Sequence, residues 1–138
     1  MNKIDSENSV LKGLHFLVAE DDDLNCEIVR TLLEMEGASC DFAKNGLMVL
    51  DQFEKHGQDY DAILMDVQMP IMNGYDATKA IRRCRHPKAK SIIIVAMTAS
   101  GFSADVKAAL DAGMNSHVAK PVDMEEFKEE MKKMLLAI

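Results

Sequence analysis

Residues that could bind a metal ion or a phosphate group follow four short apolar runs in this chain. The carboxylate of Asp66 ends one run, and those of Glu20 and Asp21 follow another. Thr98 and Lys120 follow two further runs. In an open parallel sheet the carboxyl ends of the strands lie on one edge, where ligands usually bind. If the runs are parallel strands, these five side chains converge at that edge.

The residue types at this edge suit phosphoryl chemistry. Three carboxylates at close range repel one another unless a cation or a proton lies between them. Hard oxygen ligands without a nearby His or Cys suit Mg²⁺, which keeps several waters and completes its coordination with phosphate oxygens. A lysine and a hydroxyl can hold the remaining oxygens of a phosphoryl group. A nucleophile, a metal site and a cation are together what in-line phosphoryl transfer to a carboxylate requires.

The elements that would position these residues alternate regularly along the chain. Runs typical of strands occupy 14–19, 38–43, 62–65, 91–96 and 115–119. The first helical pattern can be capped by Asp22 or Asp23 and ends at Gly37. The later helical patterns occupy 46–56, 75–84, 103–112 and 123–137. Five strand–helix units predict a doubly wound α/β domain with a parallel sheet and helices on both of its faces.

Helical spacing also predicts which side of each helix is buried. The apolar positions of the first helix are Leu24, Ile28, Leu32 and Met35. Those of the next are Leu47, Leu50 and Phe53, and those of the fourth are Val106, Ala109 and Leu110. We expect these stripes to face the sheet.

The bulk properties describe one globular domain. The chain has 138 residues, of which 48% are apolar, and a mean hydropathy of -0.10. The first dozen residues show no pattern, so we expect a tail at 1–12 and a domain at 13–138. No apolar run approaches the ~20 residues that span a bilayer, and the N-terminus lacks the apolar core of a signal peptide. These features favour a cytoplasmic location and predict no membrane contact.

The charge distribution argues against nucleic acid as a direct partner. The formal net charge is -7, whereas binding to phosphate backbones needs a basic surface. The cationic stretch 82–90 is short and has no interleaved aromatic residues. We interpret it as the solvated end of a helix, where cations are favourable and Pro87 stops the helix.

Five separated motifs then resemble response-regulator receiver domains of two-component signalling, over residues 13–138. They are VAEDD at 18–22, MDVQMPIMNG at 65–74, MTA at 97–99, GMN at 113–115 and KP at 120–121. The stretches 66–78 and 113–121 look most like the receivers of hybrid histidine kinases. The resemblance implies a flavodoxin-like (βα)5 fold with strand order 2-1-3-4-5.

The resemblance also implies a role for each candidate residue. Asp66 accepts phosphate from a phosphohistidine, and Thr98 and Lys120 contact the phosphoryl oxygens. Mg²⁺ is bound by Asp21, by Glu20 through water, by Asp66 and by the backbone carbonyl of Gln68. The peptide bond between Lys120 and Pro121 is expected to be cis. Thr98 and the residue at position 117 form a conformational switch, and here that residue is His117, where many members carry Tyr or Phe.

The implied partners are a histidine kinase or a histidine-phosphotransfer domain, with an attached or cognate output domain as a further possibility. Such a receiver catalyses its own phosphorylation and dephosphorylation and is not a dedicated turnover enzyme. Two alternatives remain open at this point. One is an aspartyl-nucleophile phosphohydrolase, although these enzymes usually carry a second Asp where this chain has Gln68. The other is a degenerate receiver that only binds proteins, although none of Asp66, Lys120 and the acidic pair is missing.

Overall fold

The computed structural model describes residues 9–99 and 103–137, which form a five-stranded parallel sheet between two layers of helices. The strands are β1 (His15–Ala19), β2 (Ser39–Ala43), β3 (Ala62–Asp66), β4 (Ile93–Thr98) and β5 (Ser116–Ala119). The helices are α2 (Asp23–Met35), α3 (Gly46–His56), α4 (Gly74–Arg83), α5 (Ser103–Ala112) and α6 (Met124–Leu136), with a short 3-10 turn at Gly57–Asp59. The strand order is β2-β1-β3-β4-β5, which confirms the predicted fold.

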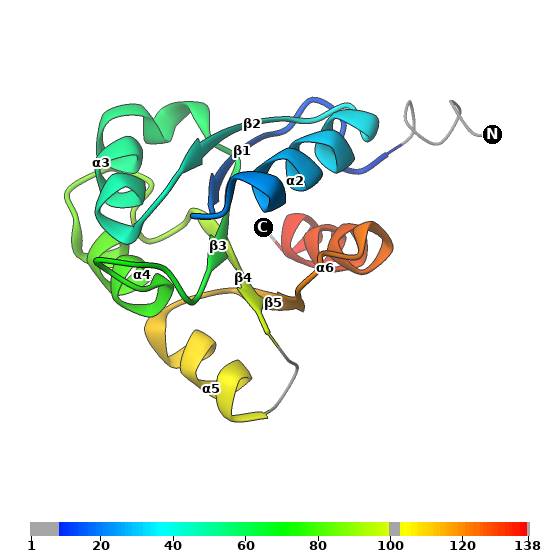
Figure 1. Ribbon diagram of the computed structural model, residues 1–138. Coiled ribbons are helices and arrows are strands. Elements are labelled where there is room, and N and C mark those ends of the chain that lie inside the picture. Colours follow the sequence, from blue (N-terminus) through cyan, green and yellow to red (C-terminus); the bar gives the residue numbers. More distant parts are fainter. Residues whose placement is uncertain (1–8, 100–102, 138) are drawn as a thin grey trace.

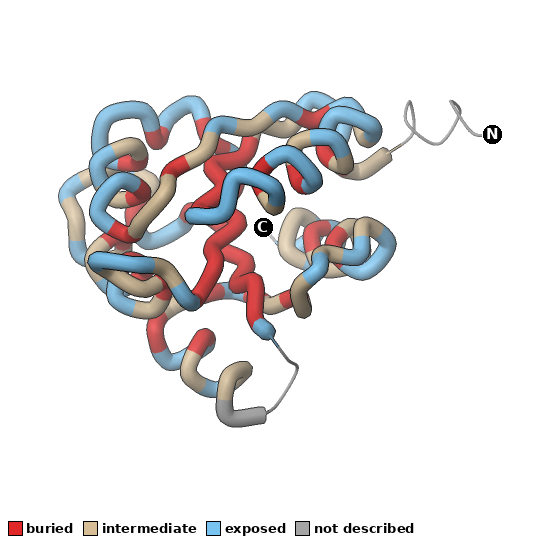
Figure 2. Tube along the Cα trace, in the orientation of Figure 1, coloured by how far each residue is buried: buried red, intermediate tan, exposed pale blue. Residues whose placement is uncertain are grey.

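The helices divide between the two faces of the sheet (Figure 1). The helices α3, α4 and α5 cover one face, and α2 and α6 cover the other. A hydrophobic core lies on each face of the sheet, and alternate residues of β3 pack into the two cores. Ile63 and Met65 pack on the first face, and Ala62 and Leu64 pack on the second. Every residue of β3 and β4 is buried, which Figure 2 shows as a continuous red centre. The sheet is therefore a rigid base for the loops at its edge.

Polar residues just before the helices fix where four of them begin. The carboxylate of Asp22 accepts a hydrogen bond from the backbone N–H of Asn25 at 2.9 Å, so α2 starts directly after the acidic pair. Asn45, Asn73 and Asp123 cap α3, α4 and α6 in the same way. Each cap lies in a loop that follows a strand, so the capping residues also shape the carboxyl edge of the sheet.

The buried sides of three helices differ from the prediction. In α2, Leu24, Ile28 and Met35 are exposed, and the sheet instead contacts Val29 and Leu33. Leu47 of α3 and Leu110 of α5 are exposed as well. The α2 sequence carries a second apolar stripe, Cys26, Val29 and Leu33, with the same helical spacing. Periodicity cannot distinguish two such stripes, and packing against Leu11, Phe16 and Val18 selects the second.

The bounds of one strand also differ from the prediction. Strand β4 runs from Ile93 to Thr98 rather than over 91–96, because Ser91 and Ile92 form a turn whose backbone N–H groups donate to the carbonyl of Lys88. The division into a tail at 1–12 and a domain at 13–138 stays a prediction, although Leu11 from that tail is fully buried. Within the described residues, no helix is long and apolar enough to cross a membrane.

Arg82, near the end of α4, ties three segments together. Its guanidinium donates to the carbonyl oxygens of Gly113 (3.0 Å), Ala89 (3.0 Å) and Ile92 (2.8 Å). It also donates to Oδ1 of Asn115 at 3.0 Å. The cationic stretch is thus in part a structural clamp, which joins α4 to the start of β4 and to the turn before β5.

We expect Arg82→Met to lower the free energy of unfolding by about 2–4 kcal/mol, because several partly buried acceptors lose a charged donor. Urea denaturation measures this change. The matched control is Arg83→Met, since Arg83 is exposed and forms no ion pair with any residue that the structure describes. The control should change stability by no more than about 0.5 kcal/mol. If both variants lost the same free energy of unfolding, the role of Arg82 as a clamp would be contradicted.

Candidate functional site

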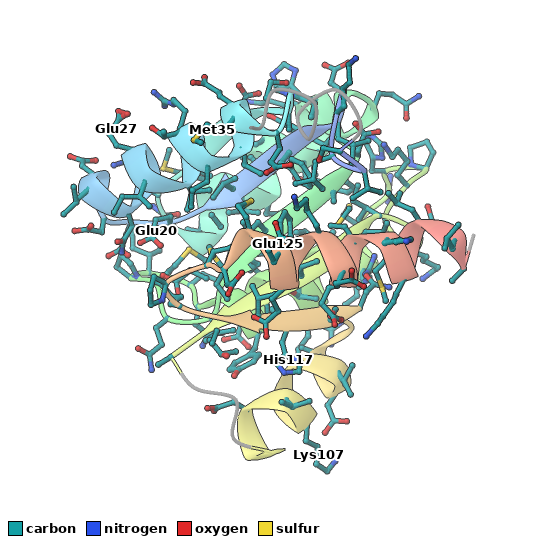
Figure 3. All side chains as sticks on the ribbon, turned by 90° about the vertical axis from the view of Figure 1, so that its right-hand side faces the viewer. Glu20, Glu27, Met35, Lys107, His117 and Glu125 are labelled. Atoms are coloured by element: carbon teal, nitrogen blue, oxygen red, sulfur yellow. The ribbon has the colours of Figure 1, made fainter. Side chains whose placement is uncertain are left out.

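Three carboxylates meet where β1 and β3 end. Strands β1 and β3 are paired neighbours with Ala19 opposite Met65, so the residues that follow them lie side by side. One oxygen each from Glu20, Asp21 and Asp66 lies within 4.8 Å of the others. Glu20 and Asp66 are only 1% and 3% exposed, whereas Asp21 is exposed to solvent. Figure 3 shows Glu20 near the first turn of α2.

Lys120 supplies the positive charge of this cluster. Its Nζ lies 3.0 Å from Oδ2 of Asp66 and 3.2 Å from Oε1 of Glu20. The contact with Asp66 is a hydrogen bond, whereas Oε1 of Glu20 is buried and makes an ion pair without hydrogen-bond geometry. The peptide bond between Lys120 and Pro121 is cis, as expected. The cluster therefore contains three carboxylates and one ammonium group.

Burial by itself lowers the pKa of Lys120, but the hydrogen bond and charge of Asp66, together with the charge of Glu20, outweigh it and raise the pKa above its usual value. A raised pKa of a cation means that its stabilising effect is complete at neutral pH. The effect is lost only as the pH rises through this raised pKa. Lys120 therefore stays charged under ordinary conditions.

Backbone contacts hold the loop that follows Asp66. The N–H of Gln68 donates to Oδ1 of Asp66 at 3.0 Å, and the N–H of Val67 donates to the carbonyl of Met97 at 3.2 Å. A Cβ atom at Gly74 would lie 2.3 Å from the carbonyl oxygen of Asp66, so only glycine fits there. The loop is thereby held against the end of β4.

The acidic cluster opens into a cleft of about 440 Å³. The three carboxylates and Lys120 line it, together with Asp22, Asn25, Val67, Gln68 and Ala99. The prediction did not include Asn25, and it included Ala99 only as part of the MTA motif, because neither side chain carries a charge that marks it as a site residue. The oxygen-rich lining and the excess of negative charge fit a hard divalent cation.

Thr98 and His117 lie on neighbouring strands but do not line this cleft. Thr98 ends β4 and is fully buried, with Ala119 of β5 opposite. His117 is half-buried on β5, opposite Ala96, two positions back from the edge. Figure 3 shows it on the side of β5 that faces α5. The structure thus brings Glu20, Asp21, Asp66 and Lys120 together and leaves His117 apart from them.

A parallel sheet of this strand order, with an acidic cleft at its carboxyl edge, defines a flavodoxin-like α/β domain. The chain belongs to the response regulator receiver domain family, whose model matches residues 16–132. It is therefore a receiver domain of two-component or phosphorelay systems, as the resemblance implied.

Several similar curated proteins are histidine kinases, and some of these are named hybrid kinases. Hybrid signal transduction histidine kinase I of Dictyostelium discoideum is 38% identical over 110 residues, which cover 78% of this chain and 6% of that protein. Probable histidine kinase 1 of Oryza sativa subsp. indica is 34% identical, and the match covers 82% of this chain and 14% of the kinase. The chain thus spans a small part of the length of these relatives.

Two solved structures show what similar domains bind. The receiver domain of sensor histidine kinase PA1611 from Pseudomonas aeruginosa PAO1 has a magnesium ion coordinated in its active site cleft. It is 31% identical with a TM-score of 0.78, and the match covers 88% of this chain and 97% of that one. The receiver domain of Saccharomyces cerevisiae Ssk1, solved with the histidine phosphotransfer protein Ypd1, is 29% identical. Its TM-score is 0.78, with 91% of this chain and 90% of that chain covered.

Proposed function

We propose that this receiver accepts a phosphoryl group from a phosphohistidine onto the carboxylate of Asp66. The observation that carries the proposal is the setting of Asp66, a buried carboxylate that opens into the cleft with the ammonium of Lys120 3.0 Å away. A carboxylate that faces a cleft beside a cation is available as a nucleophile. The exposed Asp21 leaves one side of the cluster accessible from solvent.

In the proposed reaction a carboxylate oxygen of Asp66 attacks the phosphorus, and the bond from phosphorus to the imidazole nitrogen breaks. The electron pair of that bond stays on the imidazole. Negative charge grows on the phosphoryl oxygens, and Lys120 is placed to offset it. Thr98, at the end of the adjacent strand, is the proposed hydroxyl contact for one of these oxygens. Gln68 stands where a second carboxylic acid would serve a phosphohydrolase, so we propose slow hydrolysis rather than turnover.

Mg²⁺ is the proposed cofactor, held by Glu20, Asp21, Asp66 and the backbone carbonyl of Gln68. The residues fit such an ion because their donors are all oxygens and because Oε1 of Glu20 is buried without a hydrogen bond among the described residues. The bound ion would supply charge neutralisation for the carboxylates and the incoming phosphate. Lys120 alone leaves the cluster with an excess of negative charge.

We further propose that Thr98 and His117 couple phosphorylation to a change in conformation. Thr98 is buried on β4 and His117 is half-buried on the adjacent β5, so a shift of the hydroxyl toward Asp66 would free space next to β5. The imidazole of His117 could then turn inward. If a His117→Ala variant kept the full effect of phosphorylation on partner affinity, this part of the proposal would be wrong.

The proposed partner is a histidine kinase or a histidine-phosphotransfer domain. The structure of the similar Ssk1 receiver with Ypd1 supports this class, as do the hybrid kinases among the relatives. Because the chain spans a small part of those relatives, an attached or cognate output domain is also part of the proposal. We propose a cytoplasmic site of action and no direct contact with nucleic acid or membrane.

Incubation with acetyl phosphate tests the proposed function without a partner. Intact-mass spectrometry should show the addition of one phosphoryl group when Mg²⁺ is present, and at least about tenfold slower addition when the metal is chelated. A matched incubation with Ca²⁺ controls for the effect of divalent charge alone. A wild-type protein that gains no mass in the presence of Mg²⁺ would refute the proposal.

A further inference from the structure

The stretch from α4 to the start of β4 carries most of the unpaired positive charge of the described chain. Residues 77–104 contain no Asp or Glu, although the whole sequence has 23 acidic residues. The cations within this run are Lys79, Arg82, Arg83, Arg85, Lys88 and Lys90. None of them makes an ion pair with a residue that the structure describes. Outside the run, every described Lys or Arg except Lys12 and Lys132 makes one.

The dipole of α4 explains only part of this charge. Arg82 and Arg83 lie in the last turn of the helix, where cations are favourable. Lys79 precedes Arg83 by four residues, so two like charges are neighbours on the helix surface and destabilise it slightly. Arg85 and Lys90 lie beyond the end of the helix. In a chain with a formal net charge of -7, this concentration of cations points to a function outside the folding of the domain.

Two of the six cations hold the fold. The guanidinium of Arg82 forms the clamp described above, and the ammonium of Lys88 donates to the backbone carbonyl of Tyr60. The other four are exposed, and we call them the basic patch: Lys79, Arg83, Arg85 and Lys90. Within the patch, Nζ of Lys90 donates to the carbonyl of Arg82 at 3.5 Å. The other three side chains make no hydrogen bond to a described residue and are free to bind a partner.

The basic patch stands on a rigid base. In the turn after α4, the backbone N–H of Ala89 donates to the carbonyl of His86 at 3.0 Å, and that of Ile92 donates to the carbonyl of Lys88 at 2.9 Å. Ala89 is only 3% exposed, so the turn is anchored in the core. The clamp made by Arg82 fixes the same turn to α4. A partner would therefore meet a preorganised surface, and binding would order little backbone.

Most of the patch lies at the opposite edge of the sheet from the acidic cleft. Helix α4 begins with Gly74 in the loop after β3 and ends shortly before Ile93, where β4 begins. Its 10 residues separate its two ends by about 15 Å. At physiological ionic strength charges are screened over about 8 Å. The negative charge of the cleft therefore does not cancel the positive potential at the end of α4.

The chemistry of the patch favours a segment of protein rich in carboxylates. Each guanidinium can hold one carboxylate through two parallel hydrogen bonds. None of the exposed large apolar residues of the described chain lies within 72–99, so the patch has no side chain that would anchor it in a bilayer. Residues 79–90 contain no Phe, Tyr or Trp on which a nucleic-acid base could stack.

We propose that the basic patch binds an Asp- and Glu-rich segment of a partner protein at the amino edge of the sheet. The acidic cleft stays open while this segment is bound, so one receiver can hold the partner and exchange a phosphoryl group at the same time. Binding at the patch requires no phosphate on Asp66.

The test uses a synthetic peptide of about ten residues that alternates Glu and Ser, which is long enough to span the patch when extended. The peptide is titrated into the isotope-labelled full chain, and the amide chemical shifts report both the affinity and the location of binding. We expect shifts centred on residues 79–90 and a Kd near about 1 mM at about 50 mM salt. Binding should be at least about fivefold weaker at about 500 mM salt.

The patch variant combines Arg83→Gln, Arg85→Gln and Lys90→Gln. We expect it to bind the peptide at least about tenfold more weakly than wild type, because three favourable charge contacts are lost. Its melting temperature should stay within about 2 °C of wild type, since the three side chains are exposed. Its reaction with acetyl phosphate and Mg²⁺ should stay within about twofold of the wild-type rate, because the cleft lies beyond the range of these charges.

The matched control combines Lys12→Gln, Lys107→Gln and Lys132→Gln. These lysines are exposed elsewhere on the surface, so the control changes the net charge by the same amount as the patch variant. The control should bind the peptide within about twofold of wild type, because its changes lie outside the patch.

Four results would overturn the inference. Wild type could show no shifts with the peptide, or shifts that are centred outside residues 79–90. The patch variant could bind as tightly as wild type, or the control could lose as much affinity as the patch variant. Vesicles of phosphatidylcholine and phosphatidylserine and a single-stranded DNA are titrated at the same salt concentration. Tighter binding to either of them than to the peptide would overturn the assignment to an acidic protein segment.

Discussion

Asp66→Asn is expected to abolish phosphorylation, with a rate at least about 10³-fold below that of wild type. The amide keeps the shape of the side chain but is a far weaker nucleophile than the carboxylate. The fold should remain, because Lys120 keeps its ion pair with Glu20 and the cluster loses one of three repelling charges. We therefore expect the free energy of unfolding to be unchanged or slightly higher. Intact-mass spectrometry after incubation with acetyl phosphate measures the rate, and urea denaturation measures the stability.

Asp76→Asn is the matched control for this variant. Asp76 is exposed in the first turn of α4, close in sequence to the same loop, and lies outside the cleft. The Asp76→Asn protein should be phosphorylated at the wild-type rate. An Asp66→Asn protein that gains the same mass as wild type would show that another residue accepts the phosphate.

Lys120→Met is expected to slow phosphorylation by about 10²–10³-fold, because the ammonium that would offset charge on the transferring group is lost. The same change leaves two buried carboxylates without their cation, so we expect the free energy of unfolding to fall by about 1–3 kcal/mol at neutral pH. Repulsion between the two carboxylates requires that both are charged, so the stability deficit is largest at neutral pH and shrinks as the pH falls below about 4, where carboxyls become protonated.

Urea denaturation across this pH range measures the deficit. Lys132→Met is the matched control, because Lys132 is exposed on α6 and pairs with no carboxylate that the structure describes. A deficit that is the same at every pH, or that the control shares, would contradict the assigned role of Lys120 in holding the carboxylates.

The fold could be predicted because local patterns agreed with one topology. Five apolar runs alternate with five helical patterns, and the parallel sheet in the order 2-1-3-4-5 is confirmed. The meeting of Glu20, Asp21, Asp66 and Lys120 follows from the same rule, since parallel strands bring their carboxyl ends to one edge. The roles of these residues, including Mg²⁺ binding and phosphate acceptance, stay predictions.

Features that depend on tertiary packing could not be predicted from periodicity. Helix α2 carries two apolar stripes, and only contact with the sheet decides that Val29 and Leu33 are inside while Leu24 and Ile28 are outside. The clamp made by Arg82 joins residues up to 33 positions apart, and no local pattern marks it. The positive φ of Ile71 could not be predicted from the sequence, because such a turn is usually indicated by Gly or Asn and not by isoleucine.

The most direct measurement is the chemical location of the phosphate. Wild-type protein phosphorylated by acetyl phosphate with Mg²⁺ is treated with borohydride, which reduces an acyl phosphate to an alcohol, and the reduced protein is digested and mapped by tandem mass spectrometry. The account predicts that reduction converts Asp66, and no other residue, to homoserine. Reduction at a different carboxylate, or phosphate that resists borohydride because it sits on a hydroxyl or an imidazole, would contradict the assignment of Asp66 as the phosphoacceptor.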